Sequence, residues 1–144
     1  ITIEALVRAG PHRQGGFRAA AALLGRGPGL TPSGDDVLAG FVLGCRAFGH
    51  QIPGAAAAVS QLAPLGTSAL SAQLLQHATN GQTIPEVVEF IDALTGRAAV
   101  HRAVERLLAV GHTSGAALAL GVLGAARYPA TTSTRERTAA GVSA

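Results

Sequence analysis

The sequence has no Lys, no Met and no Trp, and its only cysteine is Cys45. Because Lys is missing, Schiff-base and lysine-base chemistry within this chain are excluded. A single cysteine also excludes an internal disulfide, and a reducing compartment is the default for such a chain. Aromatic residues form only 3% of the sequence, so the core must be built from Leu, Val and Ala.

Charged residues are also scarce, at 13% of 144 residues, and the formal net charge is +3. The arginines are scattered along the chain, without a basic stripe and interleaved aromatic residues, which predicts no nucleic-acid binding. The apolar runs 37–45 and 116–126 are shorter than the ~20 residues that span a bilayer. We therefore expect no membrane segment and a cytoplasmic location. The chain starts at Ile1 and contains no Met, and we expect it to be the C-terminal part of a longer protein.

Apolar residues recur at three- and four-residue spacing through most of the chain, and alternating β-branched runs are absent. This pattern predicts an all-α fold, with a single compact helical domain over residues 1–128. The tail, 129–144, turns to Thr, Ser, Arg and Gly without periodicity, and we expect it to be disordered. The expected helices cover residues 1–9, 13–24, 33–48, 55–62, 68–79, 85–95, 97–110 and 115–128.

Two of these helices start from similar turns. Gly29-Leu30-Thr31 precedes Ser33-Gly34, and Gly111-His112-Thr113 precedes Ser114-Gly115; a further Gly follows each Ser-Gly six positions on, at Gly40 and Gly121. We expect Ser33 or Thr31 to cap the first helix and Ser114 to cap the second. Both helices are apolar on nearly all sides, which is typical of buried central helices. If they pack side by side through their glycines, their N-termini face a common pocket.

A helix N-terminus attracts anions, because its free N–H groups and the helix dipole both favour negative charge. Two such ends, with Thr and Ser hydroxyls and closely approachable Gly amides, would form an electropositive hollow for phosphate, carbamoyl phosphate or a carboxylate. The alternative is that these residues serve only as caps and turns. The candidate substrate-binding residues are Gly29, Thr31, Ser33, Gly34, Asp36, Thr113, Ser114 and Gly115.

Asp35 and Asp36 complicate an anion site, because carboxylates at a helix start compete with an anionic ligand. They either hold a divalent cation, supply a general base, or simply complement the helix dipole. Asp35 lies nearer the turn, and we take it as a catalytic candidate with His112, the imidazole best placed for proton transfer. The other histidines, including His77, are expected at the surface or at caps, and Cys45 is expected to be an inert core thiol. No Cys/His set has the spacing of a closed zinc site, so no metal ligands and no certain cofactor are assigned.

Three segments together resemble the AllH-like family: 27–36 (GPGLTPSGDD), 67–71 (TSALS) before a helix ending in Asn80-Gly81, and 111–115 (GHTSG). The resemblance extends from about residue 13 to 126. It implies a C-terminal helical domain and a subunit of oxamate carbamoyltransferase, which converts oxalurate and phosphate into oxamate and carbamoyl phosphate. Ala116 and Ala117 follow the second Ser-Gly, where the family often has an acidic residue.

Three functions stay open from the sequence. The first is part of a carbamoyltransferase-like enzyme that binds a small anionic metabolite at the two helix N-termini and works with partner protein subunits. The second is a non-catalytic assembly or regulatory subunit whose glycine-faced helices dock a partner chain. The third is a metal-dependent hydrolase that uses Asp35 and Asp36.

Overall fold

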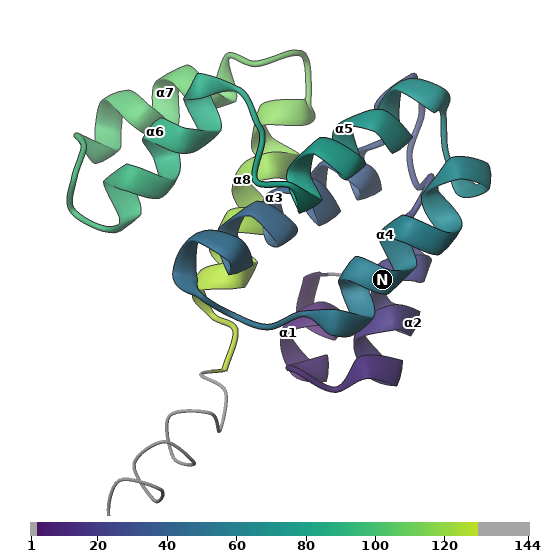
Figure 1. Ribbon diagram of the computed structural model, residues 1–144. Coiled ribbons are helices and arrows are strands. Elements are labelled where there is room, and N and C mark those ends of the chain that lie inside the picture. Colours follow the sequence, from purple (N-terminus) through teal and green to yellow (C-terminus); the bar gives the residue numbers. More distant parts are fainter. Residues whose placement is uncertain (1–2, 130–144) are drawn as a thin grey trace, which may run out of the picture.

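The computed structural model describes residues 3–129, and within that range it contains eight α-helices and no strand (Figure 1). The all-α prediction is therefore confirmed. The expected disordered tail falls on residues 130–144 and lies outside the described residues. None of the helices in 3–129 combines the length and the apolar character that crossing a bilayer needs. The helices are α1 (Ile3–Ala9), α2 (Arg13–Leu23), α3 (Ser33–Phe48), α4 (Pro53–Gly66), α5 (Ala69–Thr79), α6 (Pro85–Leu94), α7 (Val100–Leu108) and α8 (Ser114–Ala126).

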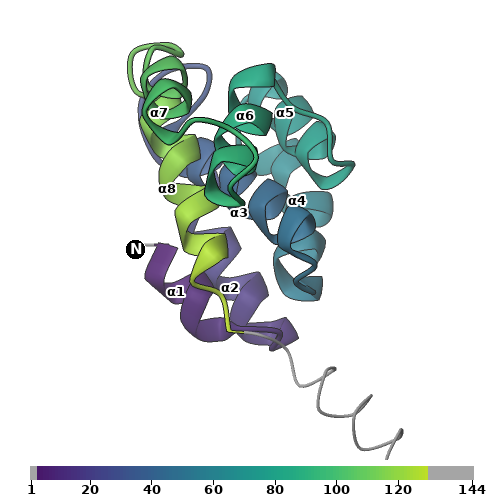
Figure 2. The same ribbon diagram turned by 90° about the vertical axis from the view of Figure 1, so that its left-hand side faces the viewer.

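Helices α3 and α8 lie side by side at the centre of the fold, with the other helices arranged around them (Figures 1 and 2). Glycines bring their backbones into direct contact. A Cβ atom at Gly40 would lie 2.2 Å from the Leu118 carbonyl oxygen, and one at Gly121 would lie 2.1 Å from the Val37 carbonyl oxygen. Only Gly fits at these two positions, as the glycine pairing in the sequence suggested.

The surrounding helices bury an aliphatic core against this central pair. Its largest fully buried side chains include Leu6, Leu38, Leu75, Leu107 and a single aromatic ring, that of Phe41. Phe41 packs edge-on against Tyr128, whose hydroxyl donates to the Gln51 carbonyl oxygen at 2.9 Å. The core therefore rests on Leu, Val and Ala, as the scarcity of aromatic residues requires.

The bounds of α4 and α7 differ most from the predicted ones. Helix α4 was expected over 55–62 but runs from Pro53 to Gly66 and includes Pro64, after which only two further residues are helical. The helix expected from Arg97 starts only at Val100.

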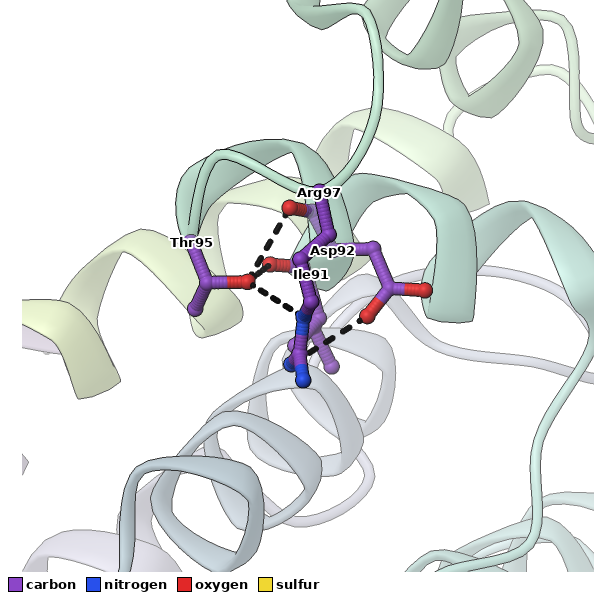
Figure 3. A network of polar contacts seen from close by, with 4 residues as sticks. All are labelled: Ile91, Asp92, Thr95 and Arg97. Atoms are coloured by element: carbon purple, nitrogen blue, oxygen red, sulfur yellow. Dashed lines mark hydrogen bonds and ion pairs between the residues drawn. The ribbon is translucent and has the colours of Figure 1, made fainter.

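The late start of α7 follows from how α6 ends. The Arg97 amide donates to the Asp92 carbonyl oxygen at 2.8 Å, which closes a turn rather than opening a helix. Figure 3 shows the side chains of this turn, where the Thr95 hydroxyl donates to the Asp92 carbonyl oxygen at 3.0 Å and accepts from Arg97 Nε at 3.1 Å. The segment from Thr95 to Ala99 is therefore a connection between α6 and α7.

Candidate functional site

The buried side chain of Asp35, only 1% exposed, holds the loop that precedes α3 in place. One of its carboxylate oxygens accepts from the Gly25 amide at 2.8 Å. The other accepts from the hydroxyls of Ser71, at 2.6 Å, and Thr67. Asp35 thus ties the Gly/Pro loop to the start of α5. Since both oxygens are engaged inside the protein, the geometry favours a positioning role for Asp35 over the proton-transfer role expected from the sequence.

Asp36 has a different environment, although it is the next residue. It is 7% exposed, and its Oδ2 atom is buried without a hydrogen-bond partner. Burial raises the pKa of its carboxyl group, the adjacent Asp35 raises it further, and a hydrogen bond with Ser114 acts in the opposite direction. The structure therefore leaves Asp36, and not Asp35, with free hydrogen-bonding capacity.

A cavity of about 420 Å³ lies against the N-terminal ends of α3 and α8, and Asp36 lines it. Thr31 and Ser114, one from each turn, line it as well, and their hydroxyl oxygens are 3.5 Å apart. The two turns therefore do converge on one hollow. Most of the remaining wall is apolar, with Leu43 and Leu118 among its residues, and no Arg lines it. The side chains do not make the hollow electropositive as expected, so any attraction for an anion comes from the helix ends.

The amides of Gly34 and Gly115, the second residues of the two helices, have partners within the protein. Gly34 N–H donates to the Arg26 carbonyl oxygen at 2.8 Å, and Gly115 N–H donates to the Val110 carbonyl oxygen at 3.0 Å. A Cβ at Gly115 would lie 1.8 Å from the Leu107 carbonyl oxygen, so this glycine is required for packing. The geometry therefore does not favour an anion bound to these two amides.

The expected caps are also replaced by backbone groups. Pro32 and Thr113 stand at the N-cap positions of α3 and α8, and neither helix has a side-chain cap. The amides of Asp35 and Asp36 both donate to the Pro32 carbonyl oxygen, at 2.9 and 3.2 Å. The hydroxyl of Ser114 is consequently free of capping duty and faces Thr31 across the cavity wall.

The other predicted site residues do not line the cavity. His112 and Thr113 are exposed, Ser33 is half-buried, and Gly29 has φ 89° with open space where a side chain would be. The structure thus brings together three of the sequence candidates: Thr31, Asp36 and Ser114.

The lining residues that the sequence did not reveal include a pair of polar side chains, His77 and Gln82. His77, at the end of α5, is exposed as expected, yet its Nδ1 atom pairs with Gln82 Oε1 at 2.7 Å and both residues line the cavity. The Asn80-Gly81 turn, with Gly81 at φ 77°, brings the two side chains together. The turn was readable from the sequence, but its position beside α3 was not.

The donor set does not favour a metal centre. No group of three or more His, Cys, Asp or Glu side chains within residues 3–129 is arranged to hold a metal ion. Both carboxylate oxygens of Asp35 accept hydrogen bonds, from Gly25, Thr67 and Ser71. Asp35 is therefore not free to bind a metal ion together with Asp36. The hydrolase that uses both aspartates therefore lacks its ligand set in the described part of the chain.

Comparison with known proteins gives one result that bears on function. No solved structure matches the chain. The family described as oxamate carbamoyltransferase subunit AllH matches residues 23–126, which include both turns, the cavity and six complete helices from α3 to α8. Because this match covers most of the 144 residues, the chain belongs to the family of the oxamate carbamoyltransferase subunit AllH.

Proposed function

We propose that this protein acts as a subunit of an oxamate carbamoyltransferase-like enzyme and that the cavity lined by α3, α5 and α8 binds a small carboxylate metabolite of that reaction. Membership of this family supports the role as an enzyme subunit. The family description names a subunit, which supports the presence of partner proteins in the enzyme. The observation that carries the binding of a metabolite is the convergence of Thr31 and Ser114, with hydroxyl oxygens 3.5 Å apart, on one cavity at two helix N-termini.

The chemistry of the wall suits a small anion with hydrogen-bonding groups. Two helix N-termini each present a partial positive charge of roughly half an elementary unit. The Thr31 hydroxyl donates a hydrogen bond to a ligand oxygen and needs no charge of its own to do so. The Ser114 hydroxyl has one proton, so it turns from Asp36 to the ligand when the ligand binds. A volume of about 420 Å³ is of the size of small-molecule pockets. These groups bind and orient a ligand; His112 lies outside the cavity and is not assigned to proton transfer.

A melting experiment with matched variants tests this proposal. Oxamate at about ten times its Kd stabilises a folded protein by about 1.4 kcal/mol, which for a chain of this size raises Tm by about 3–6 °C. Ser114→Ala removes one hydroxyl from the cavity wall, and loss of one hydrogen bond is worth about 1 kcal/mol of affinity. Ser60→Ala, on the exposed face of α4, is the matched control and should keep the full shift.

Two outcomes would contradict the proposal. One is the absence of any shift with oxamate, phosphate or carbamoyl phosphate. The other is a shift of equal size in wild type, Ser114→Ala and Ser60→Ala, because binding would then take place elsewhere.

A non-catalytic assembly subunit is the second candidate, and an exposed apolar groove favours it. The groove has a volume of about 500 Å³ and is formed by α6, α7 and α8. Two of its side chains, Leu108 and Leu120, are 51% and 55% exposed. The glycine faces that were expected to dock a partner are instead used inside the chain, where Gly40 and Gly121 join α3 to α8. If Leu120→Ser abolishes co-purification with the other enzyme subunits and oxamate does not bind, the assembly function holds alone.

A further inference from the structure

The unpaired oxygen of Asp36 points to a ligand. Among the residues from 3 to 129, its Oδ2 is the only buried side-chain oxygen or nitrogen without a hydrogen-bond partner. Leaving a polar group in this state costs about 1–3 kcal/mol, and native proteins pair nearly all such groups. Because Asp36 also lines the cavity, a bound molecule can supply the missing hydrogen bond.

The surroundings of Asp36 restrict what that molecule presents to it. No Arg lines the cavity, and His77, the other titratable side chain in its wall, is paired with Gln82. Burial raises the pKa of the group and so favours its neutral form. In either protonation state the group has an oxygen that accepts a hydrogen bond from an amide N–H, and the neutral form adds one O–H donor beside it. A primary amide, H₂N–C=O, has the complementary acceptor and donor at the same spacing, and the two groups form a pair of parallel hydrogen bonds.

We propose that the carboxyl group of Asp36 recognises a primary amide on the bound metabolite and thereby selects amide-bearing carboxylates over carboxylates that lack the amide. This inference rests on the proposed function, because it assumes that the cavity holds the ligand. It assigns the two ends of the metabolite to different groups. The amide end pairs with Asp36, and the carboxylate end lies toward the hydroxyls of Thr31 and Ser114.

Three ligands of nearly equal size separate the contributions. Oxamate carries a carboxylate and a primary amide, pyruvate replaces the NH₂ group with a methyl group, and oxalate replaces it with an oxygen that brings a second negative charge. Titration calorimetry with the purified protein should show oxamate binding at least about tenfold more tightly than pyruvate, since one hydrogen bond of about 1.4 kcal/mol corresponds to tenfold. Oxalate should also bind more weakly, because it offers no N–H donor to Asp36.

Two substitutions at the same position provide the test of the residue. Asp36→Asn keeps one donor and one acceptor in the same plane, so its preference for oxamate over pyruvate should persist. Asp36→Leu has a similar shape but no polar atoms, so oxamate and pyruvate should bind it equally. Circular dichroism establishes that each variant is folded. If the Leu variant is not, the comparison of ligands on wild type and on the Asn variant still decides the question.

The outcomes separate the inference from the proposal beneath it. If wild type binds oxamate, pyruvate and oxalate equally well, the cavity is a carboxylate site and the role assigned to Asp36 is wrong. A Leu variant that keeps the oxamate preference overturns the inference in the same way. If wild type binds none of the three, the proposed function fails and the inference falls with it.

Discussion

The contact between α3 and α8 determines where the two turns lie, and Gly40→Ala tests it most sharply. The added Cβ would lie 2.2 Å from the Leu118 carbonyl oxygen, whereas side-chain carbons in proteins stay at least about 3.0 Å from such an atom. The obstructing atom belongs to the backbone of a central helix and cannot rotate away. The two helices must therefore separate locally by about 0.8 Å, in a core whose packing density leaves no slack.

The cost can be worked out from two opposing effects. Overpacking a core costs about 1–3 kcal/mol, and a clash with backbone belongs at the upper end of that range. Ala is about 1 kcal/mol better than Gly inside a helix, which offsets part of the cost. The net loss should be about 2 kcal/mol, which corresponds to a fall in Tm of about 4–8 °C for a chain of this length.

Urea denaturation followed by circular dichroism measures the effect, with the slope m unchanged if the loss lies in the folded state. Gly66→Ala is the matched control, because Gly66 ends α4 and a Cβ there meets nothing within 4 Å. It should gain about 0.4–1 kcal/mol. If Gly40→Ala is as stable as wild type, the backbones do not touch at this point and the account of the central pair is wrong.

Further predictions concern three buried groups. Asp35→Ala should lower the free energy of unfolding by about 3 kcal/mol, because the Thr67 and Ser71 hydroxyls lose their buried acceptor. A loss below about 1 kcal/mol in urea denaturation would contradict the role of Asp35 in holding the loop before α3 against α5. Asp36→Asn should have the opposite effect at pH 7. The pKa of Asp36 is raised above 3.8 in the folded protein, so wild type loses stability as pH rises through the folded pKa. The advantage of the Asn variant should therefore vanish below about pH 4. Equal differences in Tm between the variant and wild type at pH 4 and pH 7 would refute this. Cys45 is fully buried, and burial raises its pKa to about 12, so Ellman's reagent should react with it only after unfolding; rapid labelling of the native protein would be the contrary result.

Much of the fold was readable from the sequence because its signals are local. Apolar spacing and the Gly and Pro residues between helices give the element order, and the repeated Thr/Ser-Gly turn indicates that two helices share one design. The pairing through Gly40 and Gly121 follows from the same reasoning, since small residues on an apolar face admit a close neighbour. These features depend on residues a few positions apart, which sequence patterns record well.

The different environments of the two aspartates were not readable, because they depend on residues distant in the chain. Adjacent helical positions point about 100° apart, so one carboxylate had to face away from the hollow. The carboxylate that faces away is the one that Thr67 and Ser71 can reach. Both hydroxyls donate to Asp35, so Asp36 is the residue left facing the cavity. The sequence placed Asp35 nearer the turn but gave no information on that neighbour.

The Gly34 and Gly115 amides illustrate the same limit. A helix start with Gly and Ser is compatible with a ligand site or with a tight backbone contact, and the sequence is identical in both cases. In the structure their donors go to Arg26 and Val110, whose carbonyl oxygens lie in the loops just before the helices. Only the path of those loops decides between the two uses.

The central claim is that the ends of α3 and α8 bind a carboxylate metabolite, and NMR titration of the ¹⁵N-labelled protein with oxamate tests it most directly. The account predicts saturable shifts of the amides of Thr31, Asp36 and Ser114 with a common Kd. Amides remote from the cavity, such as that of Thr95 at the end of α6, should not move. Shifts confined to other parts of the molecule, or none at millimolar oxamate, would contradict the account.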